Sequence, residues 1–333
     1  MKRIWGLLAA AVLIVGASAA SAQKTVTFAY QDMMIPWRWV QQTGEVEKAT
    51  GFKINYRQFG GGGDVIRAMA SGDVQLGEVG STGIATAVSQ GMDVEMFWVL
   101  EDIAAAEALV ARNGSGINSI KDLKGKKIAT PFVSTSHFQL LYALNKAGIK
   151  PSDAQILNMR PPEIAAAWGR GDIDATFIWN PVLSTIMPNG KVIMTSGDIC
   201  KEGACTFDGL IVTRKFAKEN PDFMVALVKA LAKADADYKA APASWSKDSD
   251  KAKAIAKWSG GKLEEVADTM KLYGFPTLAQ QASPTWLGGG ANGVVAKALT
   301  QQANFLKEQG RLSAVAPDYS KAVTAEWVTK ASK

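Results

Sequence analysis

The sequence predicts an α/β protein of two lobes joined by two crossing strands. Three observations lead to this prediction. Strand-like and helix-like stretches alternate along residues 24–99, and the same order with a similar Gly-Asp turn returns along residues 126–179. The second set lies between two look-alike apolar segments, residues 106–112 and 207–214. Alternation of this kind is typical of a parallel sheet covered by helices.

Length and composition are those of a globular protein. The 333 residues are 47% apolar and 20% charged, which is enough apolar material for a substantial core. This length suits two domains of about 150 residues each. The net charge of +6 is spread over lysines that alternate with Asp and Glu, without a basic block interleaved with aromatic residues. We therefore expect no binding to nucleic acid.

The first 22 residues have the three parts of a secretory signal peptide. Lys2 and Arg3 form the basic start, residues 4–15 form the apolar core, and residues 20–22 form a small-residue cleavage site. The apolar run is too short to cross a bilayer comfortably. We expect cleavage to release an exported protein that begins near Gln23.

Two cysteines and one histidine limit the redox and metal chemistry. Cys200 and Cys205 lie five positions apart. In an oxidising compartment we favour a local disulfide, with two free thiols as the alternative. Because His137 is the only histidine, we expect no metal site, and we expect no cofactor.

Residues 60–85 form the stretch around which the first lobe is organised. Four consecutive glycines and Asp64 suit a tight loop that enters a helix. After a short strand, Gly80, Ser81 and Thr82 begin a second helix. Helix starts of this kind can hold an anion through backbone N–H groups and hydroxyls, although a Gly-rich turn can also be a simple connection.

The remaining strands of this lobe are expected at residues 24–30, 52–59 and 94–99. Ligands of such sheets bind at the carboxyl ends of the strands. The candidate binding residues that fall at these ends are Gln31, Gly61, Gly62, Gly63, Asp64, Ser81, Thr82, Glu101 and Asp102.

The second lobe repeats the pattern, with strands expected at residues 126–130, 155–159 and 175–179. Its first strand leads into a loop that opens a helix. This loop carries the candidates Ser134, Thr135, Ser136 and His137.

The segments 106–112 and 207–214 are each introduced by an acid and closed by an arginine. We expect them to pair and to carry the chain out of the first lobe and back, forming a hinge beside a cleft. Lobe one then comprises residues 23–108 with 210–333, and lobe two comprises residues 109–209. The C-terminal helices of lobe one are expected at residues 220–238, 247–258, 262–272, 294–309 and 319–330.

Several motifs resemble type II periplasmic solute-binding proteins of ABC importers, in particular the taurine-binding branch beside the alkanesulfonate and nitrate binders. They are AYQ at 29–31, ASGDVQLG at 70–77, GS at 80–81, EALV at 107–110, PFVSTSH at 131–137, PPEIAAAWGRGDIDATFIW at 161–179 and FLKEQG at 305–310. The resemblance implies the periplasmic-binding-protein type II fold and a monomer in the periplasm. It also implies capture of taurine or a related aminosulfonate in the interlobe cleft and delivery to an ABC permease in the inner membrane.

For such a ligand we expect the sulfonate at the helix starts 61–64 and 80–82, with residues 134–136 closing from lobe two. The ammonium needs an acid, and the candidates are Asp64, Glu101, Asp102, Glu107 and Asp208. We choose Asp208 because the following glycine lets a ligand approach the backbone, and we expect Trp179 to flank the ammonium. An ion pair of Asp208 with Arg112 or Arg214 is the alternative.

Parts of the sequence also suit two other functions. Tryptophans near sheet ends (Trp37, Trp98, Trp168, Trp179 and Trp286) could form an aromatic cage for a quaternary amine, although tryptophans at such positions are usually core. Ser134, Ser136 and His137 adjoin one another, but neighbours in sequence rarely reach attack geometry. We therefore expect a binding protein and not an enzyme.

Overall fold

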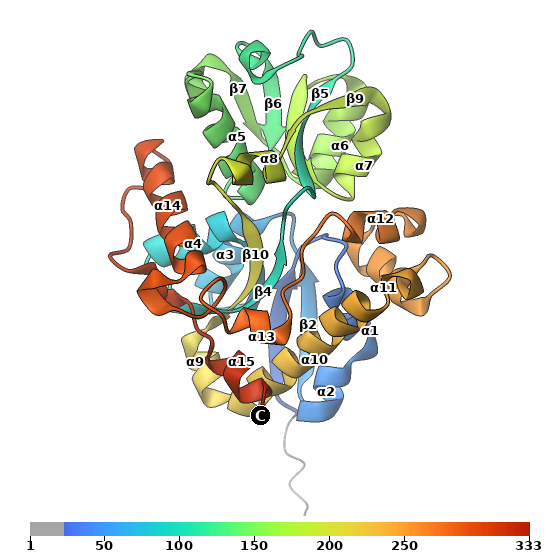
Figure 1. Cartoon of the computed structure of the whole chain (residues 1–333), viewed down its shortest axis with the longest axis vertical. Helices are drawn as coiled ribbons and strands as arrows, with labels where there is room; N and C mark the ends of the chain where they lie inside the picture. Colours follow the sequence, from blue (N-terminus) through green and yellow to red (C-terminus); the bar gives the residue numbers. More distant parts are fainter. Residues whose placement is uncertain (1–22) are drawn as a thin grey trace, which may run out of the picture.

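The structure is a computed structural model that describes residues 23–333 and has two α/β lobes, one above the other (Figure 1). Each lobe is built on one five-stranded sheet. The expected signal peptide, residues 1–22, lies outside the described residues. In the part of the chain that the structure describes, no helix has the length and apolar character needed to span a membrane.

The strands of lobe one are β1 (Thr25–Tyr30), β2 (Lys53–Gln58), β3 (Leu76–Gly80), β4 (Val94–Asp102) and β10 (Phe207–Thr213). They lie in the order β2-β1-β3-β10-β4. β1 is parallel to β2 and β3, whereas β10 runs antiparallel to both of its neighbours, β3 and β4. β4 is therefore attached to this sheet through β10.

The strands of lobe two are β5 (Glu107–Arg112), β6 (Lys127–Thr130), β7 (Gln155–Asn158), β8 (Ala175–Trp179) and β9 (Gly190–Thr195). They lie in the order β7-β6-β8-β5-β9. β6 is parallel to β7 and β8, and β5 is antiparallel to β8 and β9. The two sheets thus share one plan, as the internal repeat predicted.

Helices cover both sheets (Figure 1). Those of lobe one are α1 (Trp37–Thr43), α2 (Glu45–Thr50), α3 (Gly62–Ala70), α4 (Ser81–Ser89), α9 (Arg214–Glu219), α10 (Pro221–Ala240), α11 (Asp250–Ser259), α12 (Val266–Met270), α13 (Leu278–Gln281), α14 (Val294–Glu308) and α15 (Glu326–Ala331). Those of lobe two are α5 (Thr135–Lys146), α6 (Pro161–Arg170), α7 (Val182–Ile186) and α8 (Ser196–Lys201). Short 3₁₀ helices lie at Ile120–Leu123, Pro151–Asp153, Met187–Asn189, Pro242–Trp245, Leu263–Glu265, Gly290–Asn292 and Tyr319–Ala322.

The residue patterns explain these elements. Every residue of β3 and β8 is buried, as expected for strands covered by helices on both faces. α14 buries Val295, Leu299 and Leu306 among other residues, at the spacing of one helix face. The single helices expected over residues 262–272 and 319–330 are instead each divided into a 3₁₀ turn and a shorter α-helix. The first ends at Met270, which frees the following residues to turn toward the cleft.

The expected pairing of the two look-alike segments is wrong. β5 pairs only with strands of lobe two, and β10 pairs only with strands of lobe one. Each segment is apolar because it lies between two neighbours in its own sheet, and not because it pairs with the other. The chain instead crosses between the lobes at residues 103–106 and 202–206. The N–H of Ile103 lies 3.5 Å from the carbonyl oxygen of Thr206, so the two crossings run side by side.

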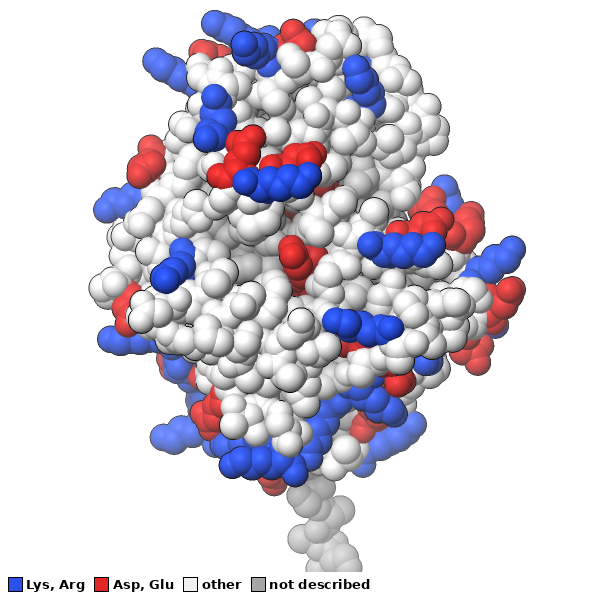
Figure 2. Space-filling model, viewed as in Figure 1, with Lys and Arg blue, Asp and Glu red and all other residues white. Residues whose placement is uncertain are grey.

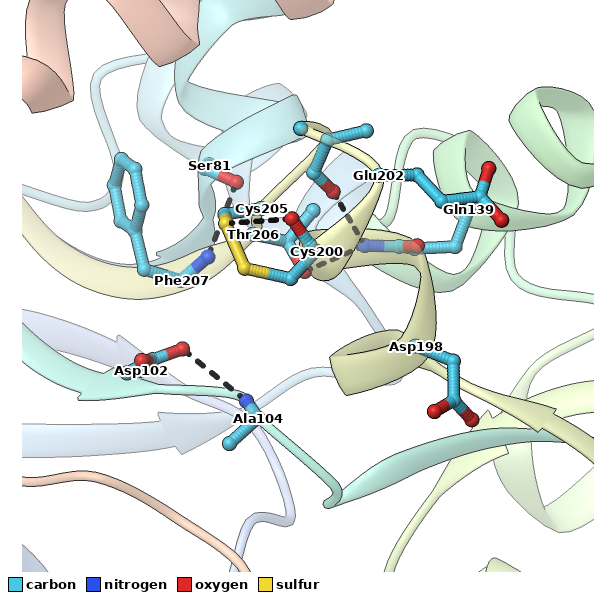
Figure 3. The surroundings of a disulfide bond; sticks show 12 residues. Ser81, Asp102, Ala104, Gln139, Asp198, Cys200, Glu202, Cys205, Thr206 and Phe207 are labelled. Carbon is cyan, nitrogen blue, oxygen red and sulfur yellow. Dashed lines mark hydrogen bonds between the residues drawn. A yellow bond between two sulfur atoms is a disulfide. The ribbon is translucent and has the colours of Figure 1, made fainter.

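Cys200 and Cys205 are joined, which confirms the favoured disulfide (Figure 3). The bond links the end of α8 to the second crossing. The Gln139 amide of α5 donates to Ala204 O (3.2 Å) and Thr206 Oγ1 (3.0 Å), and Gln302 of α14 donates to Cys205 O (3.2 Å). The second crossing is therefore held from both lobes.

Candidate functional site

A closed pocket of about 10 Å³, the space of about one water molecule, lies between the two lobes. Lobe one and the first crossing contribute Gln31, Met33, Gly62, Gly80, Ile103, Asp208 and Tyr273. Lobe two contributes Glu107, Ser134, Thr135 and Trp179. The lining contains no lysine or arginine, so an anion held there is met by backbone groups and hydroxyls.

Three helix N-termini meet at this pocket. Neither α3 nor α4 has a side-chain cap, and their first residues are Gly62 and Ser81. α5 begins at Thr135, after Ser134, whose hydroxyl accepts from the N–H of His137 at 3.1 Å. The first N–H groups of a helix lack intrahelical partners and carry partial positive charge, so this corner of the pocket suits an anion.

Glycine at position 80 is needed for the lobes to meet. A Cβ there would lie 2.9 Å from Asp208 Oδ1 and 2.9 Å from Thr135 Cγ2. The start of α4 is thereby within reach of both the acid of β10 and the helix of lobe two.

Two acids line the pocket and a third lies behind them. Asp208 is 6% exposed, Glu107 is 3% exposed and Glu101 is fully buried. Burial raises the pKa of Glu107 to about 8 and that of Asp208 to about 7. Burial, with the Asp208 charge next, raises the pKa of Glu101 well above its usual range. Among residues 23–333, no lysine or arginine forms a salt bridge with any of these three carboxyl groups.

The alternative that Asp208 pairs with an arginine is wrong. Arg112 donates to the carbonyl oxygen of Trp168 at 2.8 Å and 2.9 Å. Arg214 pairs with Asp93 and Glu95, both at 3.1 Å. Asp208 therefore faces the pocket without either cation.

Glu107 is held by hydroxyl groups of its own lobe. Thr135 Oγ1 donates to Glu107 Oε1 at 2.5 Å, and Ser196 Oγ donates to Oε2 at 3.3 Å. This acid is thus fixed beside the start of α5.

The opposite wall depends on a buried ion pair. Arg38 contacts both oxygens of Glu78 at 2.8 Å, and both side chains are fully buried. Glu78 accepts from the Gln31 N–H (3.1 Å) and from Trp37 Nε1 (2.8 Å). Gln31 Nε2 in turn donates to the main-chain carbonyl oxygen of Glu78 at 3.0 Å, so the Gln31 side chain is fixed before any ligand arrives.

Trp179 closes the pocket from lobe two by bonding across the cleft. Its Nε1 donates to Asp32 Oδ1 at 2.6 Å. Burial raises the pKa of Asp32 to about 6. Sequence reasoning missed Asp32, and it also missed Tyr273, whose buried hydroxyl has no hydrogen-bond partner among the described residues. No local pattern marked Tyr273, because its segment joins two helices far along the chain.

Several expected site residues lie outside this lining. Thr82 Oγ1 donates to Gln302 of α14 at 2.9 Å, and Ser81 Oγ accepts from the Phe207 N–H at 3.4 Å. Asp102 caps the first crossing through the Ala104 N–H at 3.2 Å. Gly61 is the N-cap of α3, and Gly63 is its second residue; neither lines the pocket.

Asp64 faces a second, outer groove of about 880 Å³. It pairs with Arg67 and, across the lobes, with Arg160 at 2.9 Å. The Asp64 carboxylate is therefore already paired with two arginines. On the face of the molecule that Figures 1 and 2 show, charges of both signs are scattered.

Ser134, which caps α5, and His137 in its first turn have structural contacts. Ser134 Oγ donates to Pro131 O at 2.6 Å, and the His137 ring stacks on Phe132 at 4.3 Å. Burial lowers the pKa of His137 to about 3, so the ring is neutral. Ser136 Oγ is buried without a partner among the described residues. Of the five tryptophans weighed for an aromatic cage, Trp179 alone is in the pocket lining.

Comparison with known proteins identifies the relatives of this chain. Residues 48–244 match the family model described as NMT1/THI5 like. The chain belongs to the NMT1/THI5-like family. It is 38% identical over 303 residues to the taurine-binding periplasmic protein of Escherichia coli (strain K12), an alignment that covers 91% of this chain and 92% of that one.

Two solved structures have the same fold as this NMT1/THI5-like protein. The alkanesulfonate-binding protein SsuA from Xanthomonas axonopodis pv. citri, bound to MOPS, gives a TM-score of 0.70 at 22% identity, covering 92% of this chain and 99% of that one. The periplasmic aliphatic sulphonate binding protein SsuA from Escherichia coli gives a TM-score of 0.71 at 23% identity, with the same coverage. The expected fold, the family and the class of periplasmic binding protein are confirmed, and these relatives are named as binding proteins and not as enzymes.

Proposed function

We propose that this NMT1/THI5-like protein captures taurine, or a close aminosulfonate, between its lobes and delivers it as a monomer to an ABC permease of the inner membrane. One observation carries the proposal: the pocket combines three helix N-termini with buried carboxyl groups and has no basic side chain in its lining. A short zwitterion with an anion at one end and an ammonium at the other fits this combination.

The sulfonate belongs at the helix starts. A tetrahedral anion with one dispersed charge accepts several hydrogen bonds at once, and the first N–H groups of α3, α4 and α5 converge from both lobes. Such a site forms fully only when the lobes meet, since α5 belongs to lobe two and the others to lobe one.

The ammonium belongs at Asp208, with Glu107 and the free hydroxyl of Tyr273 beside it. An arriving cation stabilises the ionised form of a carboxyl whose pKa is raised by burial. Trp179 and Gln31, each fixed by its own hydrogen bond, flank the chain between the two ends.

Isothermal titration calorimetry tests the proposal with taurine, ethanesulfonate, nitrate and choline as separate ligands. We expect taurine to bind most tightly, because only taurine satisfies both ends of the pocket. Tighter binding of choline would assign the pocket to a quaternary amine. Equal affinities for taurine and ethanesulfonate would show that the carboxyl groups of the pocket do not take part in recognising the ligand.

Closure of the lobes on the ligand is a second expected result. Small-angle scattering should give a smaller radius of gyration with saturating taurine than without it, because rotation of the lobes about the hinge closes the cleft. An unchanged profile at saturation would contradict this.

The Asp64–Arg160 pair allows a matched test of closure, because it joins the two lobes. Arg160→Ala should weaken taurine binding by no more than a few-fold, as expected for an exposed ion pair. Arg170 pairs with Asp172 within lobe two, so Arg170→Ala is the control and should leave affinity unchanged.

A further inference from the structure

Glu101 is a buried acid that recognition of the ligand, as proposed above, does not use. It lies on β4 directly opposite Asp208 of β10 in the antiparallel register. Directly opposed residues project to the same side with Cβ atoms about 4.5–5.5 Å apart, so their carboxyl groups can reach each other. No N–H or hydroxyl donor among the described residues reaches either Glu101 oxygen, and its carboxyl shares a side-chain hydrogen bond with Asp208, which requires a proton on one of the two.

The charges around this pair favour a proton on it. From β3, Glu78 faces the pair, but its charge is matched by Arg38 of α1. Glu107 of β5 and Asp32 after β1 add further acids, and Tyr273 adds an unpartnered hydroxyl. Two adjacent buried carboxylates without a cation are too costly to ionise together.

Exposure decides which of the two acids keeps the proton. Asp208 lines the pocket, whereas Glu101 is fully buried behind it. A ligand cation therefore reaches Asp208 first and stabilises its charge. Burial holds the pKa of Glu101 well above its usual range, and that of Asp208 is raised only to about 7.

We propose that Glu101 is a positioning residue that stays a neutral carboxylic acid and donates its O–H to Asp208, leaving Asp208 as the carboxylate that receives the ligand's ammonium. The inference rests on the proposed function. When a protonated Asp208 takes up the ammonium, its proton leaves to solvent and the proton of Glu101 stays in place. The two neighbouring acids thus have opposite roles.

The test compares three variants by calorimetry with taurine. Glu101→Gln keeps the shape and offers an N–H in place of the O–H, so its affinity should stay within about threefold of the wild type. Glu101→Leu removes the donor and should lose at least about tenfold. Asp208→Asn removes the charge and should lose the most.

A second measurement needs no ligand. The folded pKa of Glu101 lies above its usual value of 4.5, so its contribution to stability is full below that value and is lost as pH rises through the folded pKa. The Glu101→Gln variant has no titrating group at this position, so it does not lose this stability as pH rises. Its melting temperature relative to the wild type should therefore rise as pH is raised from about 5 to about 9. The exposed Glu264→Gln is the control and should show no such trend.

The outcomes separate this inference from the proposed function. Loss of taurine binding in Glu101→Gln as large as in Asp208→Asn, or wild-type binding in Glu101→Leu, would overturn the assigned roles. Failure of the wild type to bind taurine would overturn the proposed function. In that case a melting difference that does not change with pH would still overturn the neutral state of Glu101.

Discussion

Asp208→Asn should weaken taurine binding by about 2–5 kcal/mol, the range for truncating one partner of a buried, hydrogen-bonded charge pair. The substitution keeps the shape of the side chain and removes its charge. Asp208 lines the pocket, is 6% exposed and lies beside the start of α4. The ammonium would then be buried against a neutral amide, so calorimetry should show the loss directly.

Two comparisons distinguish loss of the Asp208 charge from a structural effect of the substitution. Ethanesulfonate has no amine, so its affinity should change far less than that of taurine in the same variant. Asp102→Asn is the matched control, because Asp102 caps the first crossing and does not line the pocket. Equal losses for both ligands would make Asp208 a structural residue, and Glu107 would then be the acid that receives the ammonium.

Arg38→Met should lower the free energy of unfolding by about 3–5 kcal/mol, the cost of breaking a buried ion pair by removing one partner. Arg38 contacts both Glu78 oxygens and also donates to the carbonyl oxygens of Met33 and Gln31, both at 3.0 Å. Its removal leaves the Glu78 carboxylate buried without a counter-ion. Urea unfolding, followed by circular dichroism, measures the loss.

The double variant Arg38→Met with Glu78→Leu distinguishes the pair from its packing. Replacing both partners of a buried ion pair with apolar residues is often neutral, so the double variant should recover much of the stability. It should still bind taurine less well, because the Glu78 carboxylate also accepts from the Gln31 main-chain N–H beside the pocket. If the double variant is no more stable than Arg38→Met alone, the loss in free energy of unfolding comes from packing and not from the unpaired Glu78 charge.

The sequence was informative where the chemistry is local. Glycines before α3 and α4 and the cysteine spacing each depend on neighbours in the chain, and each matches the structure. Gln31 was found because it follows β1, and Trp179 because it ends β8. Asp208 was found because it introduces one.

Other parts of the site depend on packing that the sequence does not display. At a helix start each successive residue points about 100° further round, so Thr135 reaches the pocket while His137 turns to Phe132. Tyr273 arrives from a segment between two C-terminal helices. Apolar character identified β5 and β10 as strands, but it did not show that each lies between two neighbours in the sheet of its own lobe.

The position of β10 also constrains how this chain folds. Lobe two is continuous in sequence between the two crossings, whereas lobe one requires β10 to enter between β3 and β4. Until then β4 is an apolar strand with an unpaired edge, the kind of surface that promotes aggregation. A folded lobe two holds Ile103 and Thr206 side by side and so delivers β10 to its place, replacing the closure of a long flexible loop. We therefore expect lobe two to fold before β10 joins the sheet of lobe one.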